Sequence, residues 1–281
     1  MWRPLLHLLV LLLLLLFFLL LQLPHNAASQ AHRWEDYKHQ EDYKHGRQGS
    51  EPLDRRTFCS WKCLLFTLQW PGGFCQSLDK EDLCRIPQSI NNWTIHGLWP
   101  LRVKDSCTCW PMFRSDVQEL EAELTEQWPS LLKIKSSFHF WKEEWQKHGV
   151  HAACVEGLNS PLRYFNICLK LRGLFDIHKL LKDAGITPSC ERLYKVAEVD
   201  QVLVPHLGDK HEIQCVTDDE GREVWFQVKI LLSRNLTLGC DHHGDADGDP
   251  GWGSSPAHPC PPQVPFYFLP IDHERPRRPC G

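Results

Sequence analysis

The chain has 281 residues, a length that indicates one large domain or two small ones. Hydrophobic residues make up 42% of it and charged residues 23%, which excludes disorder as the state of the whole chain. The formal net charge is −4 and the Lys and Arg residues form no block, so we do not expect bulk positive charge to hold nucleic acid near neutral pH. Because the 16 histidines gain charge in acid, anion binding should strengthen as the pH falls.

The first 29 residues have the pattern of a secretory signal peptide. Arg3 precedes an apolar stretch over residues 5–23, and small residues follow at 26–29. This order predicts cleavage near Ala28 or Ser29. The stretch is also just long enough to span a membrane, so an uncleaved anchor is the alternative. Residues 30–56, which repeat the sequence Glu-Asp-Tyr-Lys-His, are expected to form a polar, flexible arm before a single domain over 57–281.

Thirteen cysteines accompany this signal, and disulfides are the default in the secretory pathway. Since the number is odd, at least one thiol is free or pairs with another chain. The spacings match no zinc site, and we expect neither a metal nor another cofactor. Asn92 and Asn235 begin Asn-X-Thr sequons and are therefore candidate glycosylation sites.

Hydrophobic patterns predict the elements in chain order. Apolar runs predict strands at 63–70 and 93–99, and helical spacing predicts helices over about 115–128, 138–153, 160–171 and 176–184. Ser160-Pro161 is a favourable helix start, whereas Gly149 weakens the second helix. A hairpin is expected from 211–216 and 222–232, then a loop over 241–262 and a last strand at 264–269. Because helices and strands are segregated, we expect an α+β fold with helices packed on a central antiparallel sheet.

Two segments, 93–100 and 140–149, concentrate titratable and aromatic side chains. On a helix, Glu144, Lys147, His148 and His151 can share one face, and a strand end can present His96. This set suits the cleavage of an RNA phosphodiester, in which one imidazole takes the 2′-OH proton and another protonates the leaving 5′-oxygen. A lysine stabilises the negative charge of the transition state, and DNA resists because it has no 2′-OH.

The aromatic residues of the same segments suit single-stranded RNA. Bases splayed out of a single strand commonly stack on aromatic side chains. Trp99, Phe140, Trp141 and Trp145 are the candidates for such contacts, with Trp99 and Phe140 favoured.

The same two segments resemble the active-site motifs of the ribonuclease T2 family of secreted acid ribonucleases. The resemblance extends from about residue 61 to 269 and implies a ribonuclease T2-like, disulfide-stabilised α+β domain. It also implies an endoribonuclease that works best in acid, leaves a 2′,3′-cyclic phosphate and acts outside the cell or in the endolysosomal lumen. In these terms His148 is the general base and His96 the general acid, while Glu144 and Lys147 support the transition state. We expect a monomer without a membrane partner, although the odd cysteine allows an intermolecular disulfide.

Three departures from the family pattern bear on activity. Glu143 stands where the family has a histidine assigned to phosphate binding, and an i,i+4 pair with Lys147 can divert that lysine from the substrate. Val150-His151 replaces Thr-Cys, so that the cysteine moves to Cys154 and His151 is a candidate substitute for the lost imidazole. Leu101 follows the first motif where relatives often have a polar residue that contacts a base. The alternative function is therefore a catalytically inactive family member that binds RNA or another extracellular ligand.

The resemblance also bears on the disulfides. It implies the pairs Cys75–Cys84 and Cys215–Cys260. For Cys154 we expect Cys107 or Cys109 as the partner. Cys240 either pairs with Cys280 or stays free.

Overall fold

The computed structural model describes residues 59–80, 83–103, 110–240 and 257–281. The chain divides into two units, Met1–Leu53 and Asp54–Gly281, and all described residues belong to the second. The predicted signal peptide, the polar arm, Cys107, Cys109 and most of the predicted 241–262 loop lie outside the described residues. Within them, no helix is long and apolar enough to cross a membrane.

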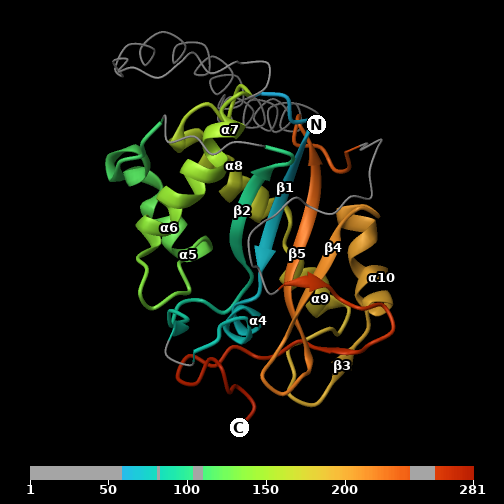
Figure 1. Cartoon of the computed structure of the whole chain (residues 1–281). Coiled ribbons are helices and arrows are strands. Elements are labelled where there is room, and N and C mark those ends of the chain that lie inside the picture. Colours follow the sequence, from blue (N-terminus) through green and yellow to red (C-terminus); the bar gives the residue numbers. More distant parts are fainter. Residues whose placement is uncertain (1–58, 81–82, 104–109, 241–256) are drawn as a thin grey trace, which may run out of the picture. The chain divides into compact units, whose positions relative to one another are not determined.

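A mainly antiparallel sheet forms the centre of the domain (Figure 1), which confirms the predicted α+β class. Its strand order is β2-β1-β5-β4-β6, and each neighbouring pair in that order is antiparallel. A short strand β3 pairs with β7, which joins β5 in a parallel contact. The strands are β1 (Cys63–Gln69), β2 (Thr94–Pro100), β3 (Leu193–Tyr194), β4 (Glu212–Thr217), β5 (Glu223–Ser233), β6 (His258–Pro259) and β7 (Phe266–Tyr267).

The strand sequences explain their places in the sheet. The apolar run of β1 is buried almost throughout because β1 lies between β2 and β5. Along β5, the alternate residues 224, 226, 228, 230 and 232 are all buried, as the period of two predicts. The predicted hairpin joins β4 to β5. Asp218 stabilises its turn by accepting hydrogen bonds from the backbone of Glu220 and Arg222, and Gly221 supplies the positive φ of 75°.

Helices occupy the connections between strands. They are α4 (Pro71–Gln76), the 3₁₀ helix η3 (Arg114–Leu120), α5 (Glu121–Gln127), α6 (Ser137–Glu144), the π-helical turn η4 (Trp145–Gly149), α7 (Val150–Ala152), α8 (Pro161–Leu174), α9 (Ile177–Asp183) and α10 (Val196–Leu207). In Figure 1, α5 to α8 lie on the β2 side of the sheet and α10 on the β4 side. Ser160 caps α8 as predicted, because its side chain accepts a hydrogen bond from the backbone N–H of Arg163.

Several predicted elements differ from the structure. The helix expected over 138–153 is interrupted by η4, and the helix expected from 115 begins as 3₁₀. Residues 258–259, predicted as loop, form β6 because the Cys215–Cys260 bond holds them beside β4. Helix α10 had no counterpart among the predicted elements, and α4 begins at Pro71, where only a strand end was expected.

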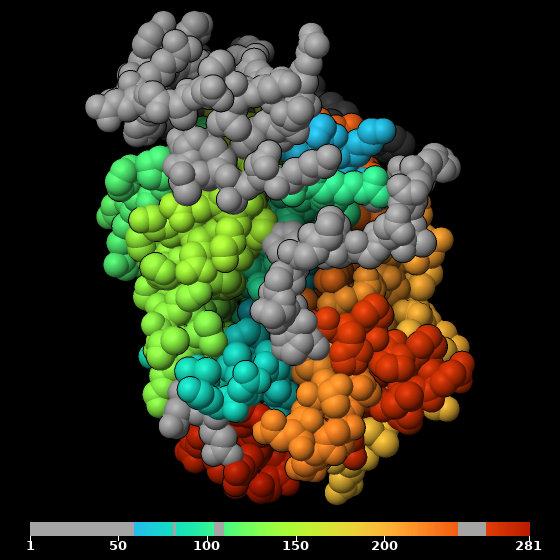
Figure 2. All heavy atoms as spheres, in the orientation of Figure 1, coloured from blue at the N-terminus to red at the C-terminus, as the bar shows by residue number. Residues whose placement is uncertain are grey.

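An aromatic cluster fills much of the core next to the sheet. The ring of Trp93 lies 5.6 Å from Trp70 and 5.0 Å from Trp225, and Phe268 lies 4.8 Å from Trp70. Because Trp93 immediately precedes β2, this packing fixes the start of the strand that carries the first motif. The C-terminal segment 257–281, red in Figure 2, closes the lower part of the face shown there.

Five disulfides connect the described cysteines: Cys59–Cys154, Cys63–Cys240, Cys75–Cys84, Cys190–Cys280 and Cys215–Cys260. The Cys75–Cys84 and Cys215–Cys260 bonds are those that the resemblance implies. The expected partners of Cys154 and Cys240 are wrong, because these cysteines bond to Cys59 and Cys63, which lie far from them in the sequence. Cys59 enters β1 beside the end of α7, and Cys240 follows β5 to the start of β1. Cys168 is free and buried, so it is not accessible for an intermolecular bond.

Candidate active site

A β-bulge in β2 places His96. Thr67 pairs with Gly97 and Leu68 with Ile95, so His96 is the extra residue between two paired positions. Its backbone carbonyl accepts a hydrogen bond of 3.0 Å from the indole N–H of Trp128. Its half-buried ring meets the side-chain amide of Gln227, with 2.5 Å between Nδ1 and Nε2. The bulge thus turns this imidazole out of the strand ladder and Gln227 fixes its orientation.

Gly97 allows β2 to approach the helix that carries the second motif. Trp99 donates a hydrogen bond of 2.9 Å from its indole nitrogen to Oε2 of Glu144. A Cβ atom on residue 97 would overlap both that nitrogen and that oxygen. Only glycine therefore leaves room for the contact that joins the two motifs.

The second motif contains the junction of α6 with η4. A π-helical turn inserts one residue into the helix and is often found at functional sites. Here it follows Glu144 directly and includes His148. Gly149 is the last residue of this turn, and only glycine fits there because a Cβ would overlap the Trp145 ring. Glu144 and His148 are consequently both turned inward, with 6% and 7% of their surface exposed.

The indole of Trp99 is the common neighbour of the three predicted catalytic side chains. Its ring centroid lies 5.0 Å from that of His96 and 5.6 Å from that of His148, and its N–H is bonded to Glu144. The ring of Phe140 is a further neighbour of His96, with 6.3 Å between the ring centroids. The two imidazoles, 52 positions apart in the sequence, are thereby brought to one site.

The pKa values of these groups are displaced from their ordinary range. Burial, with the charge of Lys229, lowers the pKa of His96 to about 4. Burial also lowers the pKa of His148 well below its ordinary value, and the neighbouring Lys147, His96 and His151 act in the same direction. Burial raises the pKa of Glu144 to about 8, against the hydrogen bond from Trp99. The site can therefore hold two neutral imidazoles and a protonated carboxyl group near neutral pH.

Lys147 lies apart from these buried groups. Its side chain is 61% exposed, and its Nζ is 3.7 Å from Oε2 of Glu143, which is the pair expected from the sequence. His151 is buried with 1% exposure, and its carbonyl accepts a hydrogen bond from Trp61. Of the four residues expected to share one helix face, Glu144, His148 and His151 are therefore buried, whereas Lys147 is exposed.

Glu143 is surrounded by basic side chains. Besides Lys147, it is paired with Lys135 at 2.9 Å and with His139 at 3.1 Å. Burial acts to raise the pKa of Glu143, but these neighbours, Lys135 foremost, lower it below its ordinary value. Glu143 therefore neutralises part of a basic cluster at the outer edge of the site.

Three neighbours of the site, Gln227, Lys229 and Lys135, were not found from the sequence. Gln227 and Lys229 are the polar positions of β5 between its apolar ones, a pattern typical of any solvated strand face. Lys135 precedes α6 and reaches Glu143 across eight residues. No local motif marks such contacts, because they depend on how distant segments pack.

A sheet-edge imidazole, a buried imidazole and a buried carboxyl group around one indole define a site able to exchange protons with a bound substrate. The described residues of this α+β domain carry it between β2 and the α6–η4 junction.

Comparison with known proteins identifies the family. The model of the ribonuclease T2 family matches residues 61–242, and the chain belongs to this family, as the two motifs indicated. The chain is 34% identical to "Ribonuclease T2" of Danio rerio over 220 residues, which cover 75% of this chain and 88% of the relative. It is 30% identical to "Ribonuclease Oy" of Magallana gigas over 220 residues, 75% of this chain and 97% of the relative.

Solved structures have the same fold. The crystal structure of human RNase T2 matches with a TM-score of 0.62 and 29% identity, covering 75% of this chain and 99% of that one. RNase NT in complex with 5′-AMP matches with a TM-score of 0.61 and 24% identity over 75% of this chain and 99% of that one. The latter similarity shows the fold alone.

Proposed function

We propose that the protein is a secreted or endolysosomal endoribonuclease that cleaves single-stranded RNA by transesterification, independently of metal. The supporting observation is the grouping of His96, Glu144 and His148 around Trp99 in a member of this family. The products are a 2′,3′-cyclic phosphate and a 5′-hydroxyl end. DNA is not a substrate, because it lacks the attacking 2′-OH.

Each side chain has a role in this reaction. His148, neutral because of its lowered pKa, accepts the 2′-OH proton while the 2′-oxygen forms its bond to phosphorus. Protonated His96 donates a proton to the 5′-oxygen as the bond between phosphorus and that oxygen breaks. Glu144, protonated up to about pH 8, donates a hydrogen bond to a phosphoryl oxygen. Lys147 adds positive charge from the exposed side, and the half-buried Phe140 is the aromatic surface for a base. Trp99, expected from the sequence to stack on a base, is only 6% exposed and holds Glu144 instead.

Digestion of single-stranded RNA at pH 5 in EDTA, with analysis of the ends, tests this proposal. We expect cyclic phosphates from the parent protein and a loss of at least about 10³-fold in His96→Ala and in His148→Ala. His206→Ala, on the exposed surface of α10, is the matched control and should cleave normally. Cleavage that persists in both active-site variants, or that produces 3′-hydroxyl ends, would refute the mechanism.

The second candidate is a family member that binds RNA or another extracellular ligand without cleaving it. Glu143, in the place of a family histidine, neutralises part of the positive charge of Lys135, His139 and Lys147, and thereby weakens the attraction of an approaching phosphate. A relative 30% identical over 181 residues is named "Ribonuclease-like storage protein" of Panax ginseng. RNA retention on the protein without new ends would support this reading over the enzyme.

Location and assembly belong to the same proposal. Five disulfides among the described residues are consistent with an oxidising compartment. Sequencing the mature N-terminus of secreted protein should place the first residue near position 29 or 30, whereas retention of residues 1–29 would indicate an anchor. Light scattering should give the mass of a monomer, because the free Cys168 is buried.

A further inference from the structure

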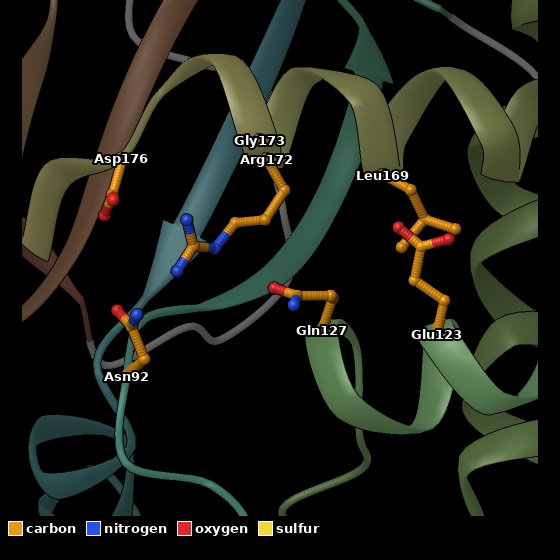
Figure 3. Close-up of a pocket in the computed structure, with 7 residues that line it drawn as sticks. All are labelled: Asn92, Glu123, Gln127, Leu169, Arg172, Gly173 and Asp176. Carbon is orange, nitrogen blue, oxygen red and sulfur yellow. The ribbon is translucent and has the colours of Figure 1, made fainter.

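A cavity of about 240 Å³ lies between α5, α8 and the start of β2 (Figure 3). Its lining includes Asn92, Gln127, Arg172, Gly173 and Asp176. In Figure 3 the guanidinium group of Arg172 points into the space between Asn92 and Gln127, which come from different elements. None of these residues takes part in the proposed cleavage of RNA.

Arg172 is a buried cation aimed into this space. Only 5% of the residue is exposed, and its Nε donates a hydrogen bond of 3.0 Å to the carbonyl of Trp93. Within the described part of the chain, neither the Nη atoms of Arg172 nor the amide of Gln127 has a hydrogen-bond partner. Asp176 compensates the charge of Arg172 only from the rim, where it caps α9. The Nη atoms of Arg172 and the half-buried amide of Gln127 therefore face the cavity as donors that a polar occupant can use.

The side chain of Asn92 is oriented by a hydrogen bond that leaves its amide nitrogen available for a glycan. Its Oδ1 accepts a hydrogen bond of 2.7 Å from the backbone N–H of Trp93, which leaves Nδ2 unused. In Figure 3 the side chain of Asn92 lies below Arg172, and both residues line the cavity. Asn92 begins the sequon Asn92-Trp93-Thr94, and Nδ2 is the atom that carries an N-linked glycan.

Thr94 supplies the hydroxyl that the sequon requires. It is 1% exposed in β2, and its Oγ1 has no hydrogen-bond partner in the described structure. A buried hydroxyl without a partner destabilises the fold, and valine would fill the same volume without this cost. The sequon needs this hydroxyl before folding is complete, and the folded protein gives it no other partner among the described residues.

We propose that this cavity is the seat of the first N-acetylglucosamine of a glycan carried by Asn92. The volume is below the range of about 300–1,000 Å³ typical of pockets for larger ligands and suits a single sugar ring. The amide and guanidinium donors match the hydroxyl and acetamido oxygens of this sugar. A free anion fits less well, because Glu123 and Asp176 also line the cavity and carry negative charge.

The proposal rests on the secretory location in the proposed function, and its test needs no RNA. The full chain is produced in a secreting eukaryotic host and treated, while folded, with a peptide N-glycosidase in heavy-oxygen water. Mass spectrometry of peptides then gives the release rate at each sequon. We expect release at Asn92 to be at least tenfold slower than at exposed Asn235, and the two rates to become equal in unfolded protein.

Gly173 allows a matched pair of variants. A Cβ at this position meets no atom within 4 Å, so larger side chains start in open space at the cavity. Gly173→Trp should fill the mouth and raise the release rate at Asn92 to that at Asn235, whereas Gly173→Ala should leave it slow. Equal rates in the folded parent protein, or slow release that survives Gly173→Trp, would overturn the proposal.

Whether a glycan is attached to Asn92 can be measured independently of RNA cleavage, so the two proposals can fail separately. Thr94→Val should remove the glycan from Asn92, whereas Thr94→Ser should retain it. A protein that cleaves RNA but carries no glycan at Asn92 refutes the sugar seat and leaves the nuclease intact. Absence of a glycan from Asn92 in the secreted protein overturns the sugar seat, and retention of the chain inside the host cell contradicts the secretory location.

Discussion

At the scale of single residues, the groups that suit the site for catalysis also act on stability. Burial favours the neutral forms of His96 and His148 and the protonated form of Glu144. Because these pKa values are displaced, both the activity and the stability of the protein should depend on pH. The two dependences can be measured separately.

Glu144→Gln should stabilise the protein at high pH and reduce its activity. The folded pKa of Glu144 is raised to about 8, so its contribution is complete below about pH 4.5 and is lost as the pH rises through 8. Gln keeps an oxygen for the indole N–H of Trp99 but does not ionise. Denaturant unfolding should give a difference in the free energy of unfolding between variant and parent that grows from pH 4 to pH 9 by a few kcal/mol, at about 1.4 kcal/mol per pKa unit, and the difference in melting temperature should grow with it. A difference independent of pH would contradict the raised pKa.

The pH dependence of cleavage should be set by His96. Because the general acid must be protonated and its pKa is lowered to about 4, kcat/KM should fall about tenfold per pH unit above that value. Lys229→Gln removes a positive charge that lowers this pKa, so the profile should move to higher pH. NMR titration of the His96 ring in both proteins measures the same shift without substrate. An unchanged profile and titration would exclude an effect of Lys229.

Glu143→His should raise kcat/KM roughly tenfold. The change removes a carboxylate whose repulsion of the substrate phosphate is about 1–2 kcal/mol. Glu143→Gln is the control for charge alone, since it also releases Lys135 and Lys147. Steady-state kinetics with single-stranded RNA at pH 5 compare the three proteins. Equal activity in all three would show that Glu143 does not limit the reaction.

At the scale of elements, two irregularities bring the motifs together: the bulge at His96 and the π-helical turn after Glu144. Each is accompanied by a glycine whose missing Cβ makes room for an indole, Gly97 for Trp99 and Gly149 for Trp145. The sequence showed both glycines, but Gly149 suggested only a weak helix. The packing of the Trp145 ring determines what that glycine does.

Gly97→Ala tests the contact between β2 and the second motif. The new methyl group overlaps Trp99 and Glu144, and such overpacking costs about 1–3 kcal/mol. We expect a lower melting temperature together with a large loss of RNA cleavage. Gly173→Ala, at an exposed helical position with open space, should instead be neutral or stabilising by up to about 1 kcal/mol. Similar thermal stability of both variants would contradict the close contact at Gly97.

At the scale of the whole molecule, disulfides tie distant segments to the sheet. Cys63–Cys240 spans 177 residues, whereas Cys75–Cys84 spans 9. In the chain-entropy model, the long loop stabilises by roughly 5 kcal/mol and the short one by roughly 2.5 kcal/mol. Replacing both cysteines of each pair by alanine should therefore lower the free energy of unfolding more for Cys63 and Cys240. Denaturant titration of the two double variants measures the order, and a reversed order would contradict the model here.

The fold class, the main strands, the cap at Ser160 and the family could all be predicted from the amino-acid sequence, because these depend on patterns a few residues long. The two histidine motifs belong to this group, since each is a continuous segment. Other contacts could be found only in the folded protein: Gln227 meets His96 across 131 positions, Lys135 pairs with Glu143, and Cys59 and Cys63 bond to Cys154 and Cys240 respectively. These contacts arise where strands and helices pack, and no local pattern encodes which distant segment will be the neighbour.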